Sequence, residues 1–326
     1  MNKVCIIIPY FGKFPNYFDF WLKSAYYNDK FDFLIFTDNK SYHTQNNVKF
    51  IHMSFEAFKK LLQKQVEFPI CLNEPYKLCD YRPLYGCALQ KYISNYKFWG
   101  FGDVDLILGN LSNFISDDIL NKYEKIYELG HLTLLRNTIR CNNLWNVKHH
   151  LKNAYRYDEA FKTPYPCHFD ETNGLTQIAK LKKINTYTHN DFADINRKKY
   201  NFSLFNVNPI EQFGIFEWKK GVLKYIFKNN DKINSKEMAY AHFQKRKLSV
   251  PCHKKIPVSF LVVPNRFLLR YDVLKELSSQ KKVKYYKYYR SNRKEEILKN
   301  IRKHAIQQRV YRIFFRKLVR YYLDKK

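Results

Sequence analysis

Two aspartates stand two residues apart in the segment Phe98-Trp-Gly-Phe-Gly-Asp103-Val-Asp105-Leu-Ile-Leu-Gly109. Apolar residues on both sides indicate buried strand structure, and the glycines before the pair indicate a sharp approach to a pocket. An Asp-x-Asp pair can hold Mn²⁺ or Mg²⁺, which prefer oxygen ligands and complete their shell with substrate phosphates. The pair therefore suggests a nucleotide-diphosphate sugar as substrate. Alone it is weak evidence, because paired aspartates near a turn are more often solvated or bound to the turn itself.

The elements around this pair indicate an α/β domain with a mainly parallel sheet flanked by helices. We expect strands at 4–8, 31–36 and 48–52 and helices at 16–27 and 54–65. Alternating strands and helices form parallel sheets, in which ligands bind beyond the carboxyl ends of the strands. That rule places Pro9–Gly12, Asp38 and Asp103–Asp105 on one rim of the sheet.

Later elements are less regular. We expect helices at 84–93 and 115–127, a strand at 131–135 and a hairpin around Lys219-Lys-Gly221. Residues 137–176 are rich in Asn, His and aromatic side chains, a composition typical of substrate-facing loops. From Pro264 onward the pattern becomes helical and strongly basic.

The composition argues against a disordered chain and points to an anionic partner. The 326 residues are 45% hydrophobic and carry a formal net charge of +29. Residues 281–326 hold 17 Lys or Arg against 3 Asp or Glu, so nearly half of the excess lies in this tail. Such an excess fits nucleic acid, an acidic membrane surface or phosphate-bearing substrates.

The cysteines and the apolar runs favour a reducing compartment. The seven cysteines are scattered without a Cys-x-x-Cys pair, and their odd number argues against a closed disulfide framework. The apolar run 4–8 is too short for the core of a signal peptide. No stretch reaches the roughly 18 apolar residues that a spanning helix needs. We therefore expect a cytoplasmic or peripheral protein.

Five blocks taken together resemble nucleotide-diphospho-sugar glycosyltransferases of the GT-A type. Within that type they are similar to a bacterial polysaccharide-biosynthesis family whose domain is labelled as of unknown function. The blocks are Ile7–Gly12, Pro75–Gly86, Phe98–Gly109, His168–Glu171 and His242–Lys247, in the family's order over residues 4–250. The resemblance implies a GT-A, Rossmann-like catalytic domain over 1–262, with a donor half of about 1–135 and an acceptor half of about 136–262. A basic, aromatic-rich helical tail over 263–326 lies outside it.

The resemblance implies a metal site. Asp103 and Asp105 match the metal-binding pair, one of which also contacts the donor ribose. His242 matches a later ligand that closes the metal shell. Imidazole favours Mn²⁺ over Mg²⁺ as the ion. The alternative for His242 is a surface histidine beside a basic cluster, and the combination of blocks favours the ligand.

The same blocks imply a set of donor-binding residues: Pro9, Tyr10, Asp38, Lys77, Asp80, Arg82, Asp103, Lys245 and Arg246. Lys245 and Arg246 would offset the charge that builds on the leaving diphosphate. Pro9, Tyr10 and Asp38 would cradle the nucleobase, with Tyr10 stacking on it. Their alternative role is that of turn residues.

The segment before the helix expected at 84–93 supplies the remaining donor contacts. Lys77 or Arg82 would pair with phosphate. Asp80 would accept a hydrogen bond from the base or a sugar hydroxyl, and a helix cap is an equal alternative for it.

Asp170 and Glu171 are the acid pair that we assign to the acceptor side. In an inverting transfer one carboxylate takes the proton from the attacking hydroxyl, and no covalent intermediate is required. Either residue is the candidate catalytic base, and the sequence does not separate the two. The alternative is that both cap the following helix, in which case a retaining mechanism with the same donor site returns to consideration.

The segment Arg309–Leu323 interleaves cations with aromatic and aliphatic residues. On a helix, Val310, Phe314, Leu318 and Tyr321 lie near one face with cations beside it. Such a helix can lie on the anionic inner face of the cell membrane, where each nearby Lys or Arg contributes about 1 kcal/mol. That contact would bring a peripheral enzyme to a lipid-linked glycan acceptor. A helix packed on the catalytic domain is the alternative.

These interpretations converge on a metal-dependent, inverting hexosyltransferase that extends a lipid-linked cell-surface polysaccharide such as a capsule or O-antigen. The resemblance implies a UDP-sugar donor, with UDP-galactose and UDP-galactofuranose as candidates. An alternative from another class is a basic nucleic-acid-binding protein. That reading needs a recognition module, and the sequence shows no zinc spacing, helix-turn-helix signature or RNA-binding aromatic motif. We therefore expect no nucleic-acid partner.

Overall fold

The computed structural model describes residues 3–196, 199–205, 213–229, 232–253 and 255–279, with 294, 297, 298 and 314 as isolated positions. The helix predicted for the tail, with the membrane contact that it would make, lies outside these described residues. Within them, no helix has the length and apolar character needed to cross a membrane.

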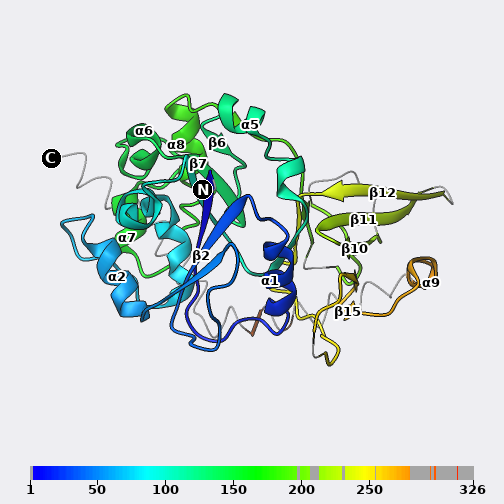
Figure 1. Cartoon of the computed structure of the whole chain (residues 1–326). Coiled ribbons are helices and arrows are strands. Elements are labelled where there is room, and N and C mark those ends of the chain that lie inside the picture. The colour runs from blue at the N-terminus through cyan, green and yellow to red at the C-terminus, as the bar shows by residue number, and fades with distance from the viewer. Residues whose placement is uncertain are drawn as a thin grey trace.

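A seven-stranded mixed sheet forms the centre of the molecule (Figure 1). Its strands are, in spatial order, β3 (Val48–His52), β2 (Phe31–Thr37), β1 (Val4–Pro9), β4 (Phe98–Gly102), β7 (Leu132–Arg136), β6 (Lys125–Ile126) and β8 (Thr186–Tyr187). The first four of these are mutually parallel, and β7 runs antiparallel to both β4 and β6. The prediction of a mainly parallel sheet flanked by helices is confirmed.

Alternating side chains give this sheet two buried faces. On β1, Ile6 and Ile8 pack in the same core as α1 (Phe18–Tyr26), whereas Cys5 and Ile7 pack in the opposite core. The α1 side also holds η2 (Leu111–Asn113), a 3-10 helix, and α5 (Asp117–Lys122). The opposite side holds α2 (Phe55–Gln63), the 3-10 helix η1 (Pro75–Leu84), α3 (Tyr85–Ala88), α4 (Gln90–Ile93), α6 (Ile139–Asn142), the 3-10 helix η3 (Leu144–Asn146), α7 (Tyr157–Lys162) and α8 (Leu175–Leu181). Burial on both faces explains why β1 and β2 are almost continuously apolar.

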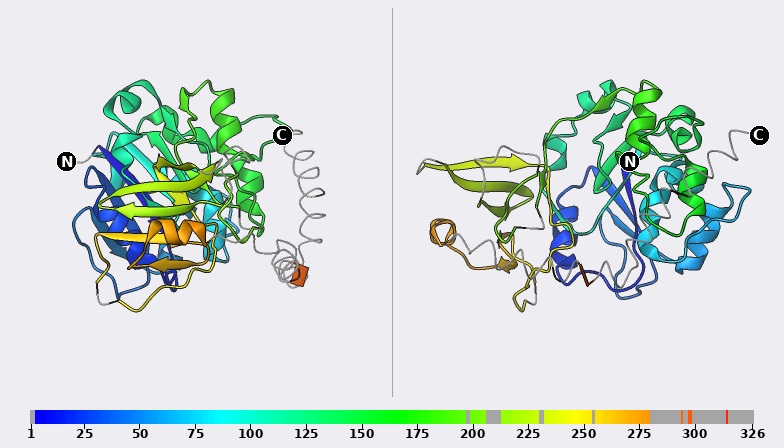
Figure 2. Two further views of the ribbon diagram at one scale, coloured as in Figure 1. Left: turned by 90° about the vertical axis from the view of Figure 1, so that its right-hand side faces the viewer. Right: turned by 180° about the vertical axis from the view of Figure 1, so that it is seen from behind.

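A second sheet of five antiparallel strands packs on the far side of α1 (Figures 1 and 2). In spatial order its strands are β12 (Lys232–Met238), β11 (Val222–Asn229), β10 (Ile215–Lys219), β14 (Ser259–Val263) and β15 (Arg266–Leu268). Phe18 and Trp21 of α1 belong to the core of the central sheet, whereas Phe20 belongs to the core of the second sheet. The helix α1 therefore joins two cores. The other face of the second sheet is covered by α9 (Val273–Ser278), which inserts Leu277.

Two predicted helices differ from the structure. The helix expected at 84–93 is divided into α3 and α4 because Leu89 leaves the helical conformation, with φ −114° and ψ 19°. The helix expected at 115–127 is shorter, since α5 ends at Lys122. Residues 125–126 instead form β6, whose backbone pairs with β7 and β8. Pairing between distant segments overrides the local helical pattern there.

The expected boundary at 262 falls inside β14. The chain beyond it does not turn helical at once, because β15 first continues the second sheet by pairing with β14. The hairpin predicted around Lys219-Lys-Gly221 is confirmed by the antiparallel pairing of β10 with β11.

Lys125 of β6 is fully buried, and its ammonium group donates to the carbonyl of Tyr127. Burial lowers the pKa of Lys125 to about 7, against a smaller opposing effect of Glu128. The side chain of a lysine in the unfolded chain has a pKa of about 10.4. Between these two values the unfolded chain binds more protons, so this residue makes the free energy of unfolding rise with pH.

We expect Lys125→Met to stabilise the protein near neutral pH, because the variant buries no ammonium group. The gain should shrink by up to about 1.4 kcal/mol per pH unit as the pH rises from about 7 to 10. Guanidinium unfolding of wild type and variant at several pH values in this range measures the difference, with Lys122→Met at an exposed position as control. A gain that does not change with pH would contradict the shifted pKa.

Candidate functional site

A three-stranded sheet beside the carboxyl end of β4 gathers the predicted metal ligands. It consists of β5 (Leu106–Leu108), β13 (Tyr240–His242) and β9 (Ala193–Asp194). The middle strand is β13, and the register places His242 opposite Leu106 on one side and Asp194 on the other. Asp105, which directly precedes β5, therefore lies next to His242.

Asp103, Asp105 and His242 form a compact group, which we call the metal group. One potential ligand atom from each residue lies within 4.8 Å of the others. The Nε2 atom of His242 is 3.6 Å from Asp105 Oδ1, and the backbone N–H of Lys245 donates to Asp105 Oδ2 at 2.6 Å. Asp103 is the most exposed member, with 29% of its side chain accessible. A ligand can thus reach the group from the Asp103 side.

The donor set of the metal group suits Mn²⁺, because it combines two carboxylates with one imidazole. Burial disfavours the charged form of His242, yet the carboxylate of Asp105, 3.6 Å away, and that of Asp194, which is hydrogen-bonded to the ring, outweigh burial and raise its pKa to about 10. Burial also opposes ionisation of Asp105, but the His242 ring and Lys245 hold the pKa of Asp105 below its usual value. At the His242 ring the positive charge is supplied either by a proton on the imidazole or by a divalent metal on the neutral ring, because a metal ligand must be deprotonated. The residues therefore fit the predicted ion.

Asp194 contacts the His242 ring on the side away from Asp105. Its Oδ1 atom is 2.9 Å from His242 Nδ1 and accepts a second hydrogen bond from Gln244 Nε2 at 2.8 Å. A proton on Nδ1 leaves Nε2, which faces Asp105, as the ligand atom of His242. The ring of His131 lies 4.4 Å from that of His242, measured between centroids.

Arg82 of η1 connects the metal group to the predicted catalytic pair. Its guanidinium donates to Asp103 Oδ1, to Asp170 Oδ2 at 2.8 Å and to the carbonyl of Gly130 at 2.8 Å. The N–H of Gly130 donates to Glu171 Oε1 at 3.0 Å. A Cβ atom on Gly130 would lie 2.4 Å from Asp170 Oδ2 and 2.8 Å from Glu171 Oε1, so a larger residue there would displace these carboxylates. These residues form one hydrogen-bonded network.

Asp170 and Glu171 differ in their access to a substrate. Asp170 has 1% of its side chain exposed, and burial raises its pKa well above the usual range against the opposing charge of Arg82. Its Oδ1 atom has no hydrogen-bond partner among the described residues. Glu171 is partly exposed. Of the pair, Glu171 is therefore the carboxylate that a hydroxyl arriving from solvent can reach.

Tyr10 and Pro9 lie where β1 ends. Pro9 is the last residue of the strand, and half-buried Tyr10 stacks on Phe14 at 4.7 Å between ring centroids. Burial raises the pKa of Tyr10, and the charges of Asp105 and Asp103 add to this effect. The tyrosine hydroxyl is therefore within electrostatic reach of the metal group, on the rim that the sequence predicts.

Asp38 follows β2 and is exposed. Its Oδ1 atom accepts the N–H of Gly12 at 2.8 Å, and Gly12 has a φ of +94°. This contact is the turn role that the sequence leaves open for Asp38, and it holds the loop after β1 against the loop after β2.

Lys77 and Asp80 are fully buried. The ammonium group of Lys77 pairs with Asp80 and donates to the carbonyls of Ala160 at 2.8 Å and Tyr165 at 2.6 Å. The carboxylate of Asp80 also accepts the backbone N–H groups of Cys167 and Phe169. The donor-binding role predicted for both residues does not fit, because neither side chain has exposed surface. The pair instead holds η1 against the segment that leads to the predicted catalytic pair, Asp170 and Glu171.

Lys245 and Arg246 point in different directions. Arg246 is buried, and its guanidinium donates to the backbone carbonyls of Asn196, Lys199 and Tyr200, the last at 2.6 Å. The predicted contact of Arg246 with a leaving diphosphate does not fit this arrangement. Lys245 is exposed, and its Nζ atom lies 3.8 Å from the centre of the Tyr76 ring. Lys245 is thus the member of the pair available to a ligand beside Asp105.

The sequence analysis does not identify three residues of the site, namely Asp194, His131 and Gly130. Each occupies a short segment without a motif, and each acquires its place only through pairing with distant parts of the chain. The weak signal available for Gly130 is its position directly before the strand expected at 131–135.

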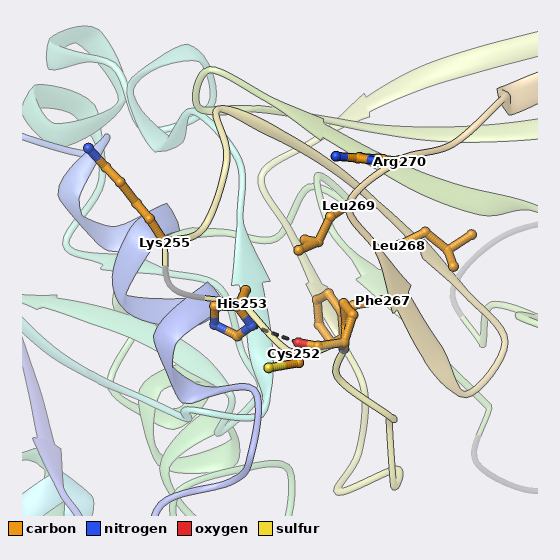
Figure 3. A pocket seen from close by; sticks show the side chains of 8 residues that line it. Cys252, His253, Lys255, Phe267, Leu268, Leu269 and Arg270 are labelled. Carbon is orange, nitrogen blue, oxygen red and sulfur yellow. Dashed lines mark hydrogen bonds between the residues drawn. The ribbon is translucent and has the colours of Figure 1, made fainter.

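A hollow of about 610 Å³ opens between the loop at 251–255 and β15. Phe267 and Leu269 contribute apolar surface, and Lys255 and Arg270 lie on opposite sides of His253 (Figure 3). None of the residues that line this hollow belongs to the metal group or to the Arg82 network.

Solved structures of glycosyltransferases show low similarity to the chain. The galactosyltransferase LgtC in complex with donor and acceptor sugar analogues is 13% identical, with 59% of this chain and 75% of that one covered and a TM-score of 0.34. An active-site mutant of LgtC is 12% identical, with coverage of 74% and 87% and a TM-score of 0.38. The glycosyltransferase GlyE of Streptococcus pneumoniae is 11% identical, with coverage of 59% and 46% and a TM-score of 0.30. Similarity of this degree carries no conclusion about activity.

No curated protein matches the sequence. A family of unknown function does match, over residues 6–271, a range that includes every predicted site residue. The predicted similarity to a family whose domain is labelled as of unknown function is confirmed. The chain belongs to the family of unknown function DUF6625.

Proposed function

We propose that the protein is a metal-dependent glycosyltransferase that moves a sugar from a nucleotide-diphosphate donor to a growing lipid-linked polysaccharide. The observation that carries the proposal is the metal group, in which Asp103, Asp105 and His242 come together from distant segments. The group lies next to the carboxyl end of a parallel strand, where α/β sheets bind their ligands. The resemblance of the five sequence blocks supports a UDP-sugar as the donor, with UDP-galactose and UDP-galactofuranose as candidates.

The metal group would hold Mn²⁺ through one oxygen of each aspartate and Nε2 of His242. The ion would bind the donor diphosphate and offset the negative charge of the leaving group. Lys245 is exposed beside Asp105 and would add a positive charge at the same place. Tyr10, near both aspartates, would contact the donor at the end of β1.

Asp194 acts in this proposal as a positioning residue. Its carboxylate accepts a hydrogen bond from Nδ1–H of His242. This hydrogen bond fixes both the orientation of the ring and the ring atom that faces the metal. Gln244 in turn donates to the same carboxylate oxygen and restrains it. Neither residue has to contact the donor for this effect.

Glu171 would act as the catalytic base of an inverting transfer. It would take the proton of the acceptor hydroxyl as the oxygen forms a bond to the anomeric carbon and the bond to the phosphate oxygen breaks. The positive charge of Arg82 would offset the repulsion between the carboxylates of Asp103 and the buried Asp170, and so hold the two side chains close together. An NMR assignment of the product anomer tests this step, because a retained configuration would rule out Glu171 as the base of a single displacement.

The proposals for the acceptor and for the location of the enzyme are based on the composition of the basic tail. We propose that residues 281–326 bring the protein to the inner face of the cell membrane, because 17 of them are Lys or Arg. A lipid-linked glycan would then be presented to the site from the membrane.

Thermal unfolding against nucleotide sugars, with and without Mn²⁺, tests the donor class. A ligand that binds only the folded state raises the midpoint, so we expect UDP-sugars to raise it by several degrees when Mn²⁺ is present. Chelation of the metal should remove the shift. No shift with any nucleotide sugar, together with a salt-sensitive shift with DNA or RNA, would contradict the proposal and favour a nucleic-acid-binding protein.

A further inference from the structure

A second hollow lies at the β8 edge of the central sheet and is separate from the metal group. Its volume is about 390 Å³, within the range of small-ligand pockets. It is lined by Tyr123, Thr186, Tyr187, Thr188, His189 and Asn190. All six residues come from two short segments, one after α5 and the other running from β8 toward β9.

Three rings give the hollow an aromatic surface. The centroids of Tyr123 and Tyr187 are 5.3 Å apart with an interplanar angle of 61°, so the two rings are inclined to each other. The ring of His189 is 6.0 Å from that of Tyr187 and nearly parallel to it, at 27°. His189 has 71% of its side chain exposed, and both tyrosines are partly exposed. Aromatic faces of this kind are available for contact with the C–H groups of a ligand.

Neutral polar groups stand beside these rings. Within the described part of the chain, the hydroxyl of Tyr123, the hydroxyl of Thr188 and the amide of Asn190 make no side-chain hydrogen bond, and Thr188 and Asn190 are exposed. None of the six lining residues is Asp, Glu, Lys or Arg, although Lys122 Nζ lies 5.5 Å from the centre of the Tyr123 ring and His189 Nδ1 lies 2.5 Å from Asp191 Oδ1. This lining favours an uncharged ligand with many hydroxyl groups over a phosphate or a nucleic acid, which would require cations.

The hollow is joined to the metal group by a row of aromatic contacts. The ring of Tyr187 is 6.1 Å from Tyr127, Tyr127 is 6.2 Å from Tyr240, and Tyr240 is 5.4 Å from His131. His131 in turn lies against His242. The segment that lines the hollow also continues directly into β9, which carries Asp194 and belongs to the three-stranded sheet of β5, β13 and β9. The hollow and the metal group therefore lie at the two ends of one row of packed rings, whose middle members Tyr127, Tyr240 and His131 are buried.

We propose that this hollow is a binding subsite for a neutral glycan chain, with the faces of Tyr187 and His189 in contact with a sugar ring. The hydroxyl of Thr188 and the amide of Asn190 form hydrogen bonds with its hydroxyl groups. The identification of this glycan as the acceptor rests on the proposed function, whereas glycan binding itself does not. The subsite would hold the growing chain at a point several sugars away from its reacting end.

Binding of neutral oligosaccharides to the full-length protein tests the subsite. The probes are gluco-, galacto- and lacto-oligosaccharides of increasing length, measured by saturation-transfer NMR and calorimetry without nucleotide or metal. We expect affinity to increase with length, and Tyr187→Ala to lower it about tenfold because the aromatic face is lost. Tyr187→Phe keeps the ring and should retain most of the affinity.

Asn190→Ala provides a second variant at an exposed position, where folding is not at risk. It should weaken binding and leave the thermal midpoint unchanged. Wild-type protein that binds none of the probes, or equal binding by wild type, Tyr187→Ala and Asn190→Ala, would overturn the subsite. The thermal shift with UDP-sugar and Mn²⁺ reports on the proposed function separately, since none of these variants touches the metal group.

Discussion

Asp105→Asn should strongly reduce Mn²⁺-dependent turnover of the donor and leave the protein folded. Asparagine has the shape of aspartate and can accept the N–H of Lys245, but it lacks the charge that binds a divalent ion. We expect the rate of donor turnover to fall by about 10²–10³-fold, the cost of losing a major electrostatic contact in an active site. Electron paramagnetic resonance of Mn²⁺ measures the loss of ion binding directly.

Two further variants sharpen this experiment. Asp194→Asn leaves the ligands in place and removes the charge that orients His242, so Mn²⁺ affinity should fall by about 10–100-fold. Asp118→Asn changes an exposed aspartate of α5 and should have no effect. Unchanged ion binding in Asp105→Asn would exclude the Asp-x-Asp assignment. Equal losses in Asp194→Asn and Asp105→Asn would instead indicate that Asp194 is itself a ligand.

Lys77→Met should lower the free energy of unfolding by about 3–5 kcal/mol, because it leaves the carboxylate of Asp80 buried without its partner. Asp80→Asn should be similarly costly, since the ammonium group then loses its counter-charge. Guanidinium unfolding measures both variants, and Lys60→Met on the exposed side of α2 is the control.

The result separates two roles for this pair. A structural pair predicts a large loss of stability, which the double variant Lys77→Met, Asp80→Leu would restore only in part, because the carbonyls of Ala160 and Tyr165 and the N–H groups of Cys167 and Phe169 also lose their partners. A phosphate-binding Lys77 predicts near-normal stability with reduced donor affinity. The second outcome would contradict the burial that the structure shows.

The sequence was sufficient for those parts of the fold that are encoded locally. The strands β1, β2 and β3 are runs of apolar residues with turn signals at their ends, so their positions could be read directly. The positions of the short strands β6 and β9 could not be read in this way. A segment of two residues shows no alternation of apolar and polar side chains, and it becomes a strand only by pairing with partners far along the chain.

The same distinction applies to the site. The spacing of Asp103 and Asp105 is a local signal, and the structure brings His242 to them. Burial is not a local signal, which is why the sequence assigned Lys77, Asp80 and Arg246 to the donor, although the structure uses them to hold backbone segments together. Asp194 carries no motif at all, since its contact with His242 depends on the register of β9 against β13.

The small sheet of β5, β13 and β9 has a consequence for folding. Long stretches of chain separate its strands, because the predicted catalytic pair lies between β5 and β9, and β10 to β12 lie between β9 and β13. Contacts of such large sequence separation form late, because the closure of a long loop must precede them. A cation at this sheet would therefore not guide early folding of the chain. The complete set of three ligands would exist only after β13 has paired with β5, so the ion would bind the finished fold more tightly than a partially folded chain.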